Sequence, residues 1–185
     1  LYDFAFSNPE PEAWLREKAA AFSRDGKTDF SETLWGQVLL HRTAIILEEC
    51  VQEITLLVAD AEHQGIQSYL PALHTDWETL RNLRDAADGM NWRQLYDAVR
   101  ALSFPRLGTR KKDEDEDAAK ELQTRRNAVK KRVQGILPLF GTEADTGFSD
   151  MALLRPYAEK LTEVELDYIR RFTAKKREKH YLEFS

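Results

Sequence analysis

The sequence has a single cysteine and no long uninterrupted hydrophobic run, and each absence excludes a class of protein. With Cys50 alone, the chain cannot form an internal disulfide, which is typical of proteins kept in a reducing compartment. The most apolar stretch is interrupted by His41, Arg42, Glu48 and Glu49, so no run of about 18 apolar residues is available to span a membrane. No basic segment followed by an apolar one marks a secretory signal. We therefore expect a cytoplasmic protein that does not cross a membrane.

The motifs of nucleotide and metal sites are also missing. The eight glycines never form the G-x-x-x-x-G-K-[ST] pattern of a P-loop, and the four histidines form no H-E-x-x-H pair. The acidic run 113–117 lacks the alternating carboxylates of a calcium loop, and it is better explained as a solvated helix N-terminus. Cys50 lies within an apolar helical pattern and is expected to be a buried thiol. The sequence thus predicts no catalytic residue, metal or cofactor in this chain.

Charge is plentiful and divided unevenly along the chain. Residues 1–100 hold 9 Lys and Arg against 17 Asp and Glu, a net charge of −8, whereas residues 101–185 hold 18 against 15, a net charge of +3. The acidic half is typical of a solvated scaffold. The second half contains local basic clusters that can meet a polyanion.

Hydrophobic residues recur at helical spacing throughout, and no strand-like alternation of any length is present. The expected helices are one that opens at 7–12 and ends before 25, a long one capped by Ser31 and ending near Glu62, and others over about 68–88, 92–102, 115–137 and from 150 onward, with a kink or break at Pro156. The sequence predicts an all-α fold built around the long central helix. The residues of that helix expected to face inward are Leu34, Trp35, Val38, Leu39, Ile45, Ile46, Val51, Ile54 and Val58.

Residues 103–108 are expected to be extended, because Pro105 pushes the residue before it out of the helical region. Four cations lie in or beside this segment, where long side chains can follow a phosphate backbone. These are Arg106, Arg110, Lys111 and Lys112.

Two further basic groups are weaker candidates, because the alternative of solvated helix faces is open for both. One is on the helix expected over 115–137, and the other forms an i, i+4, i+8 stripe on the last helix. The aromatics Trp14, Trp35 and Phe172 fall on apolar faces, so phosphate contacts to duplex DNA are favoured over base stacking on a single strand. The second group is Arg125, Arg126, Lys130 and Lys131, and the third is Arg171, Lys175 and Lys179.

Three stretches, in order and at these separations, carry a resemblance to a known family: "SNPEPEAWL", "SFPRLGTRKKDED" and "FTAKKREKHYLEFS". Together they resemble the AddA component of AddAB-type ATP-dependent helicase-nucleases, which are UvrD-like superfamily 1 helicases. The resemblance covers essentially the whole chain. At its end the family pattern is K-R-x-x-x-x-L-D-F-x-D-L, in which Glu183 replaces the usual Asp and the chain stops before the second Asp. The matching positions are Lys176, Arg177, Leu182, Phe184 and Ser185.

The resemblance implies that residues 1–185 form a single helical subdomain, called 1B, of a longer chain. That parent would use ATP and Mg to unwind DNA, degrade it with a nuclease domain, and act with an AddB-type partner subunit in double-strand break repair and recombination. None of its motor or nuclease residues is in this segment, which would instead rest on duplex DNA as an arm. The alternative is a non-enzymatic module that docks the partner subunit or the motor domain. For an inserted subdomain we also expect Leu1 and Ser185 to lie within about 20 Å of each other.

Overall fold

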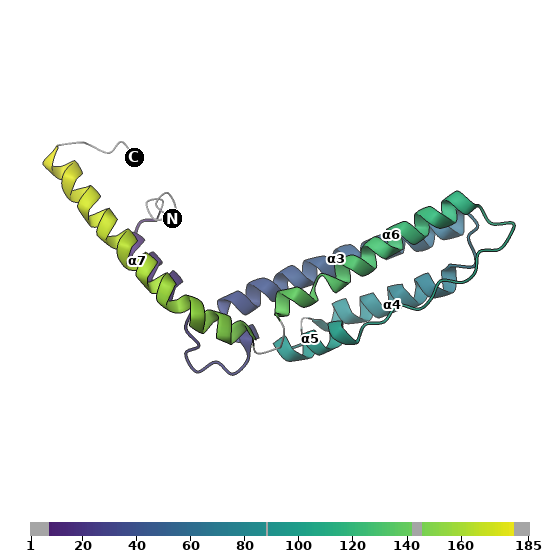
Figure 1. Cartoon of the computed structure of the whole chain (residues 1–185), viewed down its shortest axis with the longest axis horizontal. Coiled ribbons are helices and arrows are strands. Elements are labelled where there is room, and N and C mark those ends of the chain that lie inside the picture. The colour runs from purple at the N-terminus through teal and green to yellow at the C-terminus, as the bar shows by residue number, and fades with distance from the viewer. Residues whose placement is uncertain (1–7, 88, 142–145, 180–185) are drawn as a thin grey trace. The chain divides into compact units, whose positions relative to one another are not determined.

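The computed structural model describes residues 8–87, 89–141 and 146–179, which group into two compact units. One unit falls within 1–27 and 148–185, and the other within 28–147. The described residues form helices, turns and extended segments and contain no β-strand, which confirms the predicted all-α class (Figure 1). The expected distance between Leu1 and Ser185 lies outside the described residues, as do the resemblance positions after Lys179.

The larger unit is organised around one long helix, as predicted. Helix α3 (Leu34–His63) is 30 residues long and packs against both α4 (Leu70–Ala87) and α6 (Glu116–Gln134), as Figure 1 shows. The remaining elements of this unit are the short 3-10 helices η1 (Phe30–Glu32) and η2 (Leu137–Phe140) and helix α5 (Trp92–Ala101).

The core of this unit lies between α3, α4 and α6. Its buried side chains repeat at helical spacing on each helix, which is why the sequence pattern identified them as helices. Phe104 and Leu107, from the segment that joins α5 to α6, pack against the same core. The principal buried residues are Cys50, Val51, Ile54, Leu57, Ala61, Ile66, Leu73, Leu80, Leu122, Val129 and Val133.

The beginning of α3 differs from the prediction in two ways. Thr33, not Ser31, caps the helix, because its hydroxyl accepts a hydrogen bond from the Gly36 N–H at 2.9 Å. In addition, Leu34, Trp35, Val38 and Ile45 are exposed, although their spacing predicted burial. Gly36, Thr43 and Leu47, which alternate with them in the sequence, are buried. The neighbouring elements therefore cover one side of α3 and leave the other side of its apolar surface exposed.

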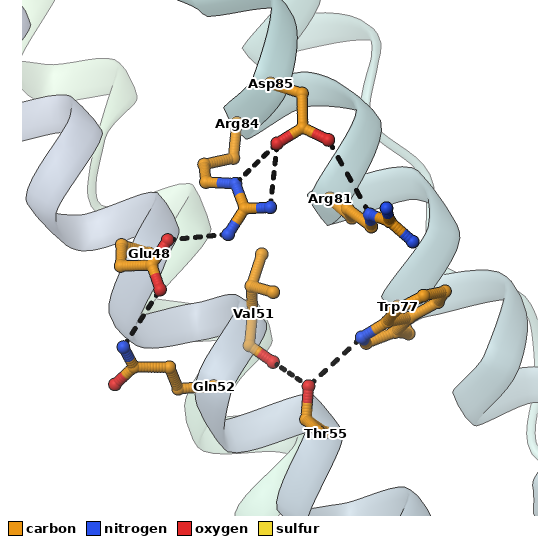
Figure 2. A network of polar contacts seen from close by, with 8 residues as sticks. All are labelled: Glu48, Val51, Gln52, Thr55, Trp77, Arg81, Arg84 and Asp85. Carbon is orange, nitrogen blue, oxygen red and sulfur yellow. Dashed lines mark hydrogen bonds and ion pairs between the residues drawn. The ribbon is translucent and has the colours of Figure 1, made fainter.

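A polar network joins α3 to α4 on the surface of this unit (Figure 2). Arg84 donates to Glu48 across the two helices at 2.7 Å, and the Trp77 indole N–H donates to the Thr55 hydroxyl at 3.0 Å. Arg81 lies over the Trp77 ring, 4.9 Å from its centroid. Exposed ion pairs are individually weak, so this network mainly fixes the register of two helices that the core already holds together.

The smaller unit pairs α2 (Pro11–Ala20) with α7 (Thr146–Glu178). Helix α2 begins at Pro11, within the stretch 7–12 where the sequence predicted a helix to open, and Leu15 of α2 is buried with Leu166 of α7. Helix α7 continues through Pro156, where the sequence predicted a kink or break.

Candidate nucleic-acid interface

An open groove of about 600 Å³ runs between α6 and the extended segment that precedes it. Residues 102–111 of that segment have no regular secondary structure, which confirms the prediction for 103–108. The groove therefore lies beside the stretch that the sequence singled out. Its lining residues are Tyr69, Phe104, Pro105, Arg106, Leu107, Gly108, Thr109, Gln123, Arg126, Asn127 and Lys130.

Under this groove lies a buried ion pair. Arg126 Nε is 2.5 Å from Asp76 Oδ2 and its Nη2 is 3.1 Å from Asp76 Oδ1, while the same Nη2 donates to the Pro105 carbonyl at 2.7 Å. Burial raises the pKa of Asp76, and the hydrogen bonds from Arg126 oppose that effect. The pair ties α4, α6 and the extended segment together. Arg126 was a candidate phosphate contact, but its side chain is only 3% exposed, so we do not retain it as one.

The sequence contained a signal for this pair. Asp76 lies between Leu73 and Leu80 on the buried face of α4, and Arg126 lies between Leu122 and Val129 on the buried face of α6. A charged residue at a position of the apolar repeat predicts a buried partner of opposite charge, because an isolated buried charge is too costly. The pattern thus marks both residues as needing a buried partner, but it does not identify which acid meets which arginine.

The far end of the extended segment is anchored to the α3–α4 connection by Glu114. This carboxylate accepts from the Ser68 N–H at 2.8 Å, the Ser68 hydroxyl at 2.6 Å and the Lys111 N–H at 2.8 Å. The hydrogen bond from Ser68 is the main cause that lowers the pKa of Glu114. Gly108 also packs closely here, because a Cβ at that position would lie 2.2 Å from the Ser68 carbonyl oxygen. The segment is thus fixed at both ends of the groove.

The four cations of the extended segment divide into two kinds. Arg106, Lys111 and Lys112 are exposed, and Arg106 lines the groove. Arg110 is half-buried, and its guanidinium donates to the carbonyls of Glu114 at 2.6 Å and Lys111 at 3.1 Å. Arg110 therefore holds the loop closed before α6.

The cations of α6 also differ in their surroundings. Lys130 lines the groove with its ammonium 5.3 Å from the centroid of the Phe104 ring, whereas Lys131 is exposed and is not part of the groove lining. Arg125 pairs with Glu53 at 2.9 Å and Asp60 at 2.6 Å, both on α3. The hydrogen bond to Asp60 is the main cause that raises the pKa of Arg125. Its charge is largely used to join α6 to α3.

The third basic group lies in the smaller unit, on α7. Arg171 forms an ion pair with Asp167 at 2.8 Å, and Lys175 and Lys179 are exposed. Their i, i+4, i+8 spacing places them on one face of the helix end, as the sequence predicted.

The other groups considered in the sequence, Cys50 and the acidic run 113–117, have structural roles. Cys50 is fully buried, and this burial raises the pKa of its thiol to about 11. Asp115 caps α6 by accepting from the Ala118 N–H at 2.8 Å, which confirms that the acidic run opens a helix. Within the described ranges, no three His, Cys, Asp or Glu side chains are grouped so as to hold a metal ion. No helix in the described part of the chain has the length and apolarity needed to cross a membrane.

We predict that Arg126→Met lowers the free energy of unfolding by about 3–5 kcal/mol, because it leaves the Asp76 carboxylate buried without its partner. Urea unfolding followed by circular dichroism measures this change. The control Lys131→Met removes the same charge from an exposed neighbour on α6 and should change stability by less than about 0.5 kcal/mol. Equal losses in the two variants would contradict the buried-pair account.

We predict a pH-dependent loss of stability at Glu114. Its pKa lies below the ordinary value of 4.5 in the folded chain, so the ionised carboxylate stabilises the fold above about pH 4.5, and this contribution disappears as the pH falls through the folded-state pKa. The Tm of Glu114→Gln should therefore be well below that of the parent chain at pH 7, and the gap should shrink in acid. A gap that stays constant with pH would show that the carboxylate charge is not what anchors the loop.

No protein-family model matches the chain. Over its whole length, however, it is similar to curated proteins that are named as the A component of an ATP-dependent helicase/nuclease. It is 28% identical over 190 residues to that of Ruminiclostridium cellulolyticum, 27% over 190 residues to that of Clostridium acetobutylicum, and 29% over 188 residues to that of Geobacillus kaustophilus. The chain spans 15% of the length of each of these relatives. These comparisons confirm the resemblance predicted from the sequence: from end to end, this chain is similar to a segment of the AddA-type component of ATP-dependent helicase/nucleases.

Proposed function

We propose that this chain is a DNA-binding accessory arm of an ATP-dependent DNA helicase/nuclease that acts in double-strand break repair and recombination. The names of the relatives supply the helicase and nuclease activities, which we assign to the parent protein and not to this segment. ATP and Mg would serve that parent, as would an AddB-type partner subunit. The task of this segment is to hold duplex DNA through its phosphates, without reading base sequence.

The observation that carries this proposal is the division of the cations in the larger unit. Arg110, Arg125 and Arg126 use their charges inside the protein, as described above. Arg106, Lys111 and Lys112 are exposed on the anchored extended segment, and none of them forms an ion pair with an acidic side chain of the described residues. Exposed cations on a fixed backbone are suited to a polyanion, because little conformational entropy is lost on binding.

A second function, docking to another protein, is supported by one observation on α7. Five exposed apolar side chains follow a 3-4-3-4 spacing, whereas Leu166 and Ile169 pack with α2. One of the five, Leu161, also borders a pocket lined by residues of α2. This spacing is the heptad seam that packs against another amphipathic helix. The five residues are Leu154, Tyr157, Leu161, Val164 and Tyr168, exposed by 49, 69, 51, 57 and 47%.

We predict that the chain binds random-sequence duplex DNA with an affinity that falls steeply as salt rises. The double variant Lys111→Ala and Lys112→Ala should reduce the slope of log K against log salt by about 2, since each lost phosphate contact removes about 0.9. Fluorescence anisotropy with a labelled duplex measures both quantities. The control variant Lys18→Ala and Lys160→Ala removes the same net charge from lysines paired with Glu17 and Glu163, and it should leave the slope unchanged.

Two outcomes would contradict the DNA-binding role. Equal effects of the two double variants would mean that DNA binding depends only on the net charge of the chain and not on a defined surface. Absence of binding at low salt would make docking through the apolar seam of α7 the better account of the chain.

A further inference from the structure

We propose that the groove between α6 and the extended segment is a phosphodiester site that receives the backbone of one DNA strand. In this site Arg106 and Lys130 supply positive charge, and Thr109, Gln123 and Asn127 supply neutral hydrogen bonds. The inference rests on the proposed function and makes it more specific, because it locates recognition in a shaped site that includes uncharged residues. It also predicts that Lys130 contacts DNA in the groove and that its sequence neighbour Lys131 does not.

The lining of the groove has the chemistry of an anion site. Arg106 contributes a cation from the extended segment and Lys130 contributes one from α6, while none of the described residues that line the groove is an Asp or Glu. Asp76, the partner of the lining residue Arg126, is fully buried. Its negative charge is therefore neutralised mainly by Arg126. The other two cations of the lining are Arg106, which is exposed, and Lys130, which is half-buried.

The α6 wall presents its polar groups in a regular row. Gln123, Asn127 and Lys130 are spaced at i, i+4 and i+7, so they share one face of the helix. Gln123 and Asn127 are exposed, and their amide N–H groups can donate to non-bridging phosphate oxygens. Lys131 is i+4 from Asn127, but it is not among the residues that line the groove.

The groove is held in shape before any ligand arrives. The Pro105 carbonyl is bound by Arg126, and the Phe104 ring lies 5.3 Å from the Lys130 ammonium, so the wall and its lysine are fixed by named contacts. At the other end, Glu114 anchors the segment to Ser68. Arg126, Asp76 and Glu114 are thus positioning residues. A preformed site loses less entropy on binding than one that must be ordered by its ligand.

The volume fits a backbone segment. A groove of about 600 Å³ lies within the usual range of roughly 300–1,000 Å³ for ligand sites, and it is open, so a strand can enter and leave it along its length. An acidic peptide would present carboxylates to the same two cations. A carboxylate also has two oxygens, so the cations and amides alone fit either anion. The phosphodiester is favoured because the groove is open and its polar residues repeat along α6, which suits a strand that carries an anion at every nucleotide.

The test compares variants of the chain in duplex binding by anisotropy at fixed low salt. Lys130→Gln should weaken binding about tenfold and Gln123→Ala with Asn127→Ala about threefold, whereas Lys131→Gln should change it by less than about twofold. A duplex with neutral methylphosphonate linkages should bind the parent chain and the Lys130→Gln variant equally weakly. Thermal unfolding of each variant establishes that the fold is retained, and the exposed amides of Gln123 and Asn127 provide a test that does not disturb the core.

The outcomes separate this inference from the proposed function. Retained DNA binding with equal effects of Lys130→Gln and Lys131→Gln, and no effect of the amide variant, would overturn the groove while leaving the arm role intact. Loss of all DNA binding by the parent chain would overturn both. Tight groove-dependent binding of an acidic peptide, without binding of duplex DNA, would also overturn the phosphodiester assignment.

Discussion

The buried pair of Arg126 and Asp76 is the interaction on which the candidate interface depends. It joins α6 to α4 across the core and uses a third hydrogen bond to hold the Pro105 carbonyl. A hydrophobic contact of similar size would bury as much surface, but it would not fix the direction of an extended backbone. The pair thus fixes the position of one groove wall in addition to packing two helices together. The charge of Arg126 is paired with Asp76 and is not available to a ligand.

Much of the fold was predictable because its elements repeat at helical spacing. The length of α3, the end of the first helix before Gly26 and the extended segment before α6 all follow from local rules of periodicity, turn residues and proline. What local rules could not give was which side of α3 its packing partners cover. Leu34, Trp35, Val38 and Ile45 were therefore expected inside but lie exposed. The sequence also predicted a kink or break at Pro156, where α7 has no break.

The candidate site was predictable in its location but not in its composition. The basic residues around Pro105 marked the segment that forms one wall of the groove, because proline and cations are visible in sequence. Whether a given arginine meets solvent or an acid depends on residues 50 to 72 positions away, such as Asp76 for Arg126 and Glu53 for Arg125. Neutral residues such as Gln123 and Asn127 gave no signal at all, since an exposed amide on a helix is ordinary until a groove is found beside it.

The central claim is that DNA meets the larger unit at the groove beside α6. A titration of the isotope-labelled chain with a short duplex, followed by backbone amide chemical shifts in nuclear magnetic resonance, tests it residue by residue. The account predicts that the largest shift changes fall in 104–112 and 123–130. Changes confined to the end of α7, around Arg171, Lys175 and Lys179, or no changes at low salt, would contradict it.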